Sequence, residues 1–322
     1  MHKTCLLTLI TFVVGTQQAL AQVTYPGGSL PVDTPRIFAR GILSDGLSNR
    51  DFTISPDGDE IFFTLQQPRF RSSTILRLVK RGGRWGKPEV APFSGRYRDL
   101  EATFSADGKT IYFSSDRPVQ GNKTKDFDIW KVGRKPDGVW GEPENLGPEV
   151  NSGKDEFYPS ITKSGNLYFT TEATYGKGSE DIVVCKWVNG RYAKPESLPE
   201  DIDTKYDEFN AFVDRDERFI IFSCYGRPDD LGRGDLYISH KDTNGNWLPV
   251  RHLAAPINSA SLDYCPYVTR DGKYLVFTSN RPAAVFTDGK TKAYQQLLLM
   301  LTQAGNGNDD IYWMKFDNNW LK

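Results

Sequence analysis

The chain carries almost no net charge, because 40 lysines and arginines are balanced by 41 aspartates and glutamates, which leaves a formal charge of −1 at pH 7. Proteins that hold nucleic acid or an anionic membrane by electrostatics are distinctly basic. Long apolar runs are missing too. Beyond the N-terminal segment the best candidate is Leu297–Leu301, far short of the roughly 18 residues that a membrane helix needs. We therefore expect no nucleic-acid partner and no membrane insertion.

Histidine is scarce, with three in 322 residues. His2 lies in the segment interpreted below as a leader, and His240 and His252 are separated in sequence, so a zinc site or a serine triad has little to draw on. Gly-x-Ser-x-Gly and the phosphate-binding P-loop pattern are absent. We expect no catalytic residue of these kinds and no cofactor. Calcium binding at Asp229-Asp230 or Asp309-Asp310 is an alternative, although neither pair has the spacing of a known calcium loop.

The N-terminal residues have the order of a secretory leader. Lys3 supplies a positive start, Cys5 to Val14 an apolar run, and Ala19-Leu20-Ala21 an A-x-A cleavage site. We predict a signal peptide over residues 1–21, cleavage near Ala21, a linker over residues 22–34, and a monomeric product in the periplasm or outside the cell.

Cysteine is equally sparse, and cleavage would leave Cys185, Cys224 and Cys265. An odd number cannot all pair in an exported protein. Each lies inside an apolar strand pattern, so we interpret them as buried free thiols, with a Cys224–Cys265 disulfide as the alternative.

What the sequence does contain is one unit repeated five times. A phenylalanine in an apolar run marks the register and recurs at intervals of 50 to 56 residues, at Phe63, Phe113, Phe169, Phe222 and Phe277. A turn such as Asp107-Gly108 precedes it, an Asp-Ile-Trp-like signature follows it, and an aromatic residue such as Trp140 is expected to open a fourth strand. Asp-Gly between apolar runs is a strong hairpin signal.

Four short strands in each repeat predict an all-β fold, a single β-propeller of four-stranded blades. The repeats lie near residues 50–98, 99–154, 155–206, 207–262 and 263–322, within a propeller domain over 35–322. We predict five blades, with six as the alternative because 283–307 adds a non-repetitive insertion. The apolar segment after Pro35 predicts an N-terminal strand that completes the last blade and removes an open sheet edge.

The repeat resembles a known family. Phe104-Ser105-x-Asp107-Gly108-Lys109, then Ile111-Tyr112-Phe113-Ser114-Ser115-Asp116-Arg117-Pro118, is similar to the WD40-like repeat of TolB-like periplasmic propellers. The resemblance covers residues 35–322 and implies a propeller and export. It says little about function, because propellers occur as binding platforms, as accessory domains of hydrolases and as lyases. We expect no counterpart of the separate N-terminal domain of TolB-like proteins in these 322 residues.

Charged residues recur before the first strand and after the second, positions that a blade places on one face. The acids are Asp51, Glu101, Glu156, Glu208 and Asp263, and the arginines are Arg117, Arg227 and Arg281. They could pair bidentately between neighbouring blades, or form a rim that recognises a ligand or a cation. Tyr158 and Tyr264 beside the acids suit sugar stacking or protein contact. The insertion over 283–307 is a further candidate for specificity.

Two functions are compatible with these features. The first is an exported, non-catalytic binding or scaffolding propeller that recognises an envelope protein or glycan through the acidic and aromatic rim. The alternative is a carbohydrate-active enzyme, a glycoside hydrolase or polysaccharide lyase, that uses two rim carboxylates.

Overall fold

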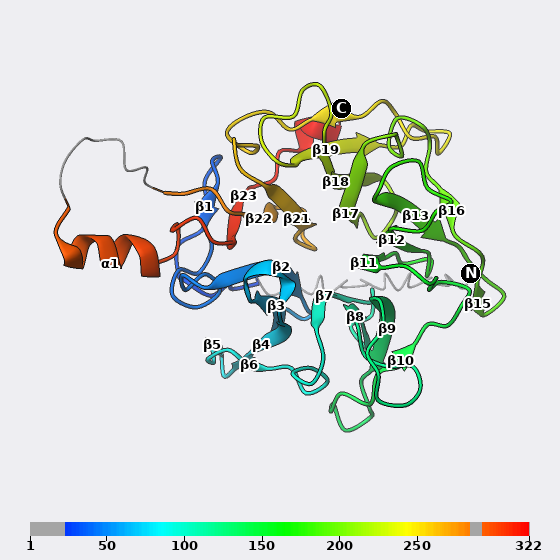
Figure 1. Ribbon diagram of the computed structural model, residues 1–322, viewed down its shortest axis with the longest axis horizontal. Coiled ribbons are helices and arrows are strands. Elements are labelled where there is room, and N and C mark those ends of the chain that lie inside the picture. The colour runs from blue at the N-terminus through cyan, green and yellow to red at the C-terminus, as the bar shows by residue number, and fades with distance from the viewer. Residues whose placement is uncertain (1–22, 284–291, 322) are drawn as a thin grey trace, which may run out of the picture.

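The computed structural model describes residues 23–283 and 292–321, and shows a ring of five antiparallel sheets around a central axis (Figure 1). Successive blades, each written from the inner to the outer strand, are β2-β3-β4-β6, β7-β8-β9-β10, β11-β12-β13-β16, β17-β18-β19-β20 and β21-β22-β23-β1. The structure therefore confirms the predicted five-bladed propeller.

The strands are short and regularly spaced. The inner strands are β2 (Ser48–Ile54), β7 (Asp99–Phe104), β11 (Glu156–Ile161), β17 (Asp207–Val213) and β21 (Asp263–Val268). The second strands are β3 (Glu60–Gln66), β8 (Thr110–Ser115), β12 (Leu167–Thr171), β18 (Phe219–Tyr225) and β22 (Tyr274–Ser279). The third strands are β4 (Ser73–Arg81), β9 (Asp128–Gly133), β13 (Asp181–Cys185), β19 (Asp235–His240) and β23 (Asp310–Lys315).

The outer strands are only two residues long. They are β6 (Glu89–Val90), β10 (Glu144–Asn145), β16 (Glu196–Ser197), β20 (Arg251–His252) and β1 (Arg36–Ile37). The aromatic residues expected to open them stand earlier, in the pairs β4-β5 (Arg84–Trp85) and β14 (Trp187–Val188)-β15 (Arg191–Tyr192) and in single bridges at Trp140 and Trp247. Proline follows within three residues of each repeat aromatic, and because it lacks an N–H it interrupts the pairing before the outer strand. These aromatics are Trp85, Trp140, Tyr192 and Trp247.

The N-terminal strand closes the ring. In the fifth blade β1 pairs antiparallel with β23, placing Arg36 opposite Trp313 and Ile37 opposite Tyr312 (Figure 1). Just beyond β1, Phe38 stacks on Trp313 with ring centroids 4.1 Å apart. The first and last parts of the propeller thus share one sheet, as the sequence predicted.

The repeated phenylalanines form the core. All five lie on second strands and are at most 1% exposed. Between the blades they join apolar clusters, such as the one built by Phe62, Phe93, Phe113 and Trp140. A blade packed on both faces is what stabilises a fold with such short strands.

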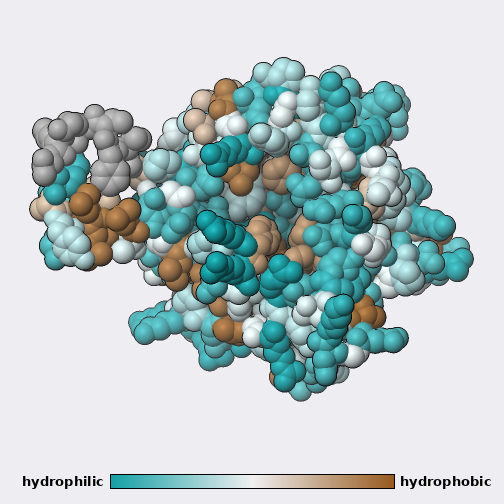
Figure 2. All heavy atoms as spheres, in the orientation of Figure 1, coloured by the Kyte–Doolittle hydropathy of each residue, from teal (hydrophilic) through white to brown (hydrophobic). Residues whose placement is uncertain are grey.

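Several segments lie outside the blades. The helix α1 (Tyr294–Thr302) projects from the fifth blade, and its apolar side chains are exposed (Figures 1 and 2). The short helices η1 (Pro68–Phe70) and η2 (Asn318–Leu321) complete the elements. Residues 23–34 form no strand, but Tyr25 packs edge-on against Phe38 and Trp313.

The predicted signal peptide over residues 1–21 lies outside the described residues, as does 284–291 of the insertion. Within the described part of the chain, no helix has the length and apolar character to cross a membrane. Cys185, Cys224 and Cys265 are buried and free, as interpreted from the sequence.

Candidate functional site

Each inner strand contains a β-bulge, and the residue at the bulge has a positive φ between 49° and 61°. These residues are Asp51, Glu101, Tyr158, Asn210 and Cys265, one from each blade, and we call them the axial ring. Bulges reorient side chains that a regular strand would point elsewhere. Although the five are far apart in sequence, they contact one another at the axis.

Glu101 is the centre of the axial ring. Its carboxylate accepts hydrogen bonds from the Tyr158 N–H at 2.7 Å and from Asn210 Nδ2 at 3.2 Å. The Cys265 thiol donates to Asn210 Oδ1 at 3.5 Å, and the Glu101 N–H donates to Asp51 Oδ2 at 3.2 Å. The ring is therefore a hydrogen-bonded network across the channel.

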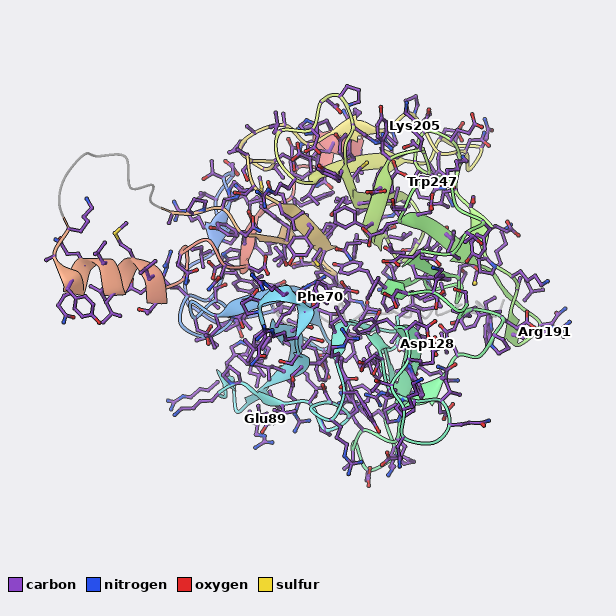
Figure 3. All side chains as sticks on the ribbon, in the orientation of Figure 1. Phe70, Glu89, Asp128, Arg191, Lys205 and Trp247 are labelled. Carbon is purple, nitrogen blue, oxygen red and sulfur yellow. The ribbon has the colours of Figure 1, made fainter. Side chains whose placement is uncertain are left out.

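Arg50 supplies the positive charge of this network. It is 3% exposed, forms an ion pair with Glu101, and donates to Cys265 Sγ at 3.2 Å. Its guanidinium lies 4.8 Å from the ring centroid of Tyr264 and 5.9 Å from that of Phe70, which Figure 3 labels close to β2. Arg50 thus contacts both the acidic residue Glu101 and the aromatic residues Tyr264 and Phe70.

Burial dominates the titration of these carboxyls. It raises the pKa of Asp51 to about 8, against the opposing effect of Arg50, and it also raises the pKa of Glu101. A cavity of about 10 Å³, lined in part by Asp51, Glu101 and Tyr158, adjoins the ring. That volume holds about one water molecule. The two carboxyls are therefore arranged as buried network members, without room for a sugar ring between them.

The other predicted rim residues form a second group, here called the arginine clamps. Arg117 lies 2.6 Å from Asp99, Arg227 lies 3.1 Å from Glu208, and Arg281 lies 2.5 Å from Asp263. Both partners belong to one blade, because its first and second strands are antiparallel neighbours. The pairing expected between blades occurs instead through backbone carbonyls, since the same arginines donate to Phe93, Ile202 and Ile257 in the preceding connections.

The third blade has no such arginine. Glu156 there accepts hydrogen bonds from the hydroxyl and the N–H of Ser152, and burial raises its pKa to about 8. All five predicted acids are at most 3% exposed, and Tyr158 and Tyr264 are also buried. The predicted acids and tyrosines are therefore buried. Asp51, Glu101 and Tyr158 belong to the axial ring, Glu208 and Asp263 belong to the clamps, and Glu156 and Tyr264 belong to neither group.

A larger cavity of about 300 Å³ opens at the other end of the channel, where the turns after the inner strands converge. Its lining combines aliphatic residues such as Val213 and Val268 with polar ones such as Thr269. Two half-buried aromatic residues, Phe212 and Tyr267, also line the small cavity at the axial ring and so lie between the two. We call it the turn-side cavity. On the face shown in Figure 2, hydrophobic residues also gather near the centre of the ring.

Arg215 and Arg270 line the turn-side cavity. Burial, together with the neighbouring Arg215, lowers the pKa of Arg270, while Arg270 donates to the Ala106 carbonyl. Among the described residues neither arginine forms a salt bridge, and Arg215 Nε has no hydrogen-bond partner. Arg218, by contrast, is held bidentately by Asp214 at 2.7 and 2.9 Å.

Sequence reasoning missed these arginines, although a signal was present. Lys163, Arg215 and Arg270 occupy the same turn position in three consecutive repeats, where the first two repeats carry Pro56 and Ala106. In each acidic pair considered for calcium, at least one carboxylate accepts hydrogen bonds from nearby groups. Asp230 accepts from the N–H groups of Gly226 and Gly232, and Asp309 from Ser48.

Neither a family model nor a curated protein matches the sequence. Solved structures do match. A structure described as a glycoside hydrolase has a TM-score of 0.52 at 8% identity, with 89% of this chain covering 92% of the other. A thermostable family-43 glycoside hydrolase has 0.49 at 11%, with 91% of this chain covering 92% of that one. TolB from Acinetobacter baumannii has 0.47 at 15%, with 83% of this chain covering 54% of that one. The chain thus spans about half the length of TolB. At these identities the likeness shows the propeller fold alone.

Proposed function

We propose that the protein is a non-catalytic binding propeller of the cell envelope, and that its turn-side cavity receives the carboxyl-terminal end of a partner protein. The observation that carries this proposal is the pair formed by Arg215 and Arg270, two adjacent cations that form no salt bridge among the described residues. Arginine recognises carboxylates bidentately, and desolvation in a cavity strengthens the contact.

The shape of the cavity favours a chain end. Phe212 and Tyr267 separate it from the axial ring, so a ligand would enter from one side only. Aliphatic residues of the lining, such as Val213 and Val268, suit an apolar side chain next to the carboxylate.

The enzymatic alternative has less support. Asp51 and Glu101 are the obvious carboxylate pair, but they are at most 3% exposed and Glu101 is paired with Arg50. Glycosidases need two carboxyls that flank a bound glycosidic bond. The resemblance to glycoside hydrolases concerns the fold, which does not determine function.

Binding of a panel of short apolar peptides, each with a free or an amidated C-terminus, tests the proposal by calorimetry. We expect the free acids to bind, and Arg215→Gln with Arg270→Gln to weaken binding at least about 30-fold, the loss for a desolvated charge partner. Lys163→Gln, at the equivalent turn position outside this cavity, is the control and should bind normally.

Equal binding of amidated and free peptides, or no binding of any peptide, would overturn the proposal. Oligogalacturonate serves as the glycan arm. If it binds with the same arginine dependence while the peptides do not, the ligand is an anionic glycan and the assignment to a protein partner is wrong.

A further inference from the structure

The second and fourth blades share a polar arrangement where the third strand meets the outer strand. In the second blade, Asn145 Nδ2 donates to Asp128 at 2.6 Å, and Asn151 exchanges hydrogen bonds with the backbone of Ile129 at 2.8 and 3.1 Å. In the fourth blade, His252 contacts Asp235 at 2.6 Å and Asn258 exchanges the same bonds with Leu236. An amide thus joins the strand to the next connection.

The third blade departs from this arrangement. Asp181 stands where the other blades have Asp128 and Asp235, but Ser197 replaces the outer-strand donor and Asp203 replaces the asparagine. An aspartate cannot donate to a strand carbonyl as asparagine does. The result is two carboxylates at a position where the other two blades have one.

Glu208 adds a third carboxylate from β17. One oxygen from each of Asp181, Asp203 and Glu208 lies within 4.8 Å of the others, and all three residues are fully buried. Figure 3 labels Lys205, which belongs to the same connection and lies near the outer edge of the ring.

Three of the six carboxylate oxygens in this cluster have no hydrogen-bond donor among the described residues. Among the described residues neither Asp203 oxygen accepts a hydrogen bond, and Asp181 Oδ2 has none either. Lys177 Nζ lies 4.0 Å from Asp203 Oδ2, beyond hydrogen-bond range, and donates to the Asp203 carbonyl instead. The Glu208 carboxylate accepts from Arg227 and Thr204, and Asp181 Oδ1 accepts from the N–H groups of Lys177 and Gly178. Buried carboxylates without donors are costly unless a cation or a proton compensates them.

We propose that Asp181, Asp203 and Glu208 bind a divalent cation that fastens the third blade to the fourth. The three ligands are all carboxylate oxygens, the hard donors that Ca²⁺ prefers, and the chain is expected to be exported. Asp181 is on the third blade and Glu208 on the fourth, so the ion would link adjacent blades directly. The competing explanation is a proton shared by Asp181 and Asp203. Burial and the neighbouring Asp181 raise the pKa of Asp203 to about 7.

Thermal unfolding of the full chain, stripped with EDTA and then titrated with Ca²⁺, tests the site. A ligand that binds only the folded state should raise the Tm by roughly 5 °C at a hundredfold excess over its Kd. Equilibrium dialysis with elemental analysis should find one bound ion in each chain. Mg²⁺ and Mn²⁺ are titrated in parallel to identify the preferred cation.

Asp203→Asn is the decisive variant, because it installs the amide that Asn151 and Asn258 use and should fold. We expect it to lose both the bound ion and the Tm response. Asp201→Asn, in the same connection but exposed, should keep both. An unchanged response in Asp203→Asn overturns the proposal, and so does a stripped wild type that responds to none of the three cations. In the second case a fall in Tm near pH 7 that the wild type shows and Asp203→Asn lacks would identify the shared proton.

Discussion

Arg50 is the residue on which the axial ring depends. It is buried against Glu101 and Cys265, and it is not part of the repeat, since the other blades have leucine, phenylalanine or tyrosine at its position. A buried ion pair adds little stability compared with an apolar pair, but removing one partner leaves a buried charge alone. Removing Arg50 would therefore leave the buried Glu101 carboxylate without its cation.

Replacing Arg50 tests this view. We expect Arg50→Met to lower the free energy of unfolding by about 3–5 kcal/mol in urea denaturation, because Glu101 would keep its place without a cation. The control is Lys186→Met. Lys186 Nζ lies 2.7 Å from Glu196 Oε2, and both side chains are exposed, so losing this ion pair should cost less than about 1 kcal/mol. Equal costs for the two variants would show that the axial pair is not the compensated charge described here.

At the scale of elements, the two-residue outer strands form the fewest backbone hydrogen bonds in each blade, so side-chain packing must hold them in place. β1 has two residues, yet it carries the closure of the ring. Phe38 follows it, is fully buried, and packs between Phe52 of β2 and Trp313 of β23. This ring of aromatic contacts holds the first blade to the fifth.

Phe38→Ala should therefore weaken closure. We expect a loss of about 3–5 kcal/mol, the usual cost of truncating a buried phenylalanine, measured by chemical denaturation. Phe70→Ala is the matched control, because Phe70 is 40% exposed and should cost much less. The closure model predicts in addition that the Phe38 variant becomes sensitive to proteolysis near its N-terminal segment. Resistance equal to wild type would contradict it.

At the scale of the whole molecule, several buried carboxyls have raised pKa values, each chiefly through burial. The values are about 8 for Asp51 and Glu156, about 7 for Glu180 and about 6 for Asp310. In the unfolded chain such groups titrate near pH 4. Between these limits the folded protein binds more protons than the unfolded chain.

Stability should consequently fall as the pH rises. The contribution of these groups is complete below about pH 4 and is lost as the pH passes through about 6 to 8. We expect the Tm, measured in buffer without divalent cations, to drop by several degrees between about pH 5 and pH 8. A Tm that climbs over the same interval would mean that these carboxyls are ionised in the folded protein.

Local patterns were enough to predict the architecture. The Asp-Gly turns, the phenylalanine register and the spacing of the repeats depend on neighbours within about 50 residues, and the hairpins they predict are present. The order of the inner strands followed from the repeat, and closure by β1 followed from a strand left over at the start. The same patterns placed Asp51, Glu101 and Tyr158 in the predicted site, but they predicted an exposed rim, whereas the three residues are buried.

Tertiary structure decided how those residues meet. The axial ring contains five different residue types, so no repeat in the sequence marks it, and only the bulges and the closed circle bring Asp51, Asn210 and Cys265 together. Tertiary structure also brings together Arg215 and Arg270, which come from different blades. It places Asp203, whose carboxylate oxygens have no donor among the described residues, beside Asp181. Turn and strand preferences act locally along the chain, whereas burial, charge compensation and cavities arise from contacts between blades, and these exist only once the ring has closed.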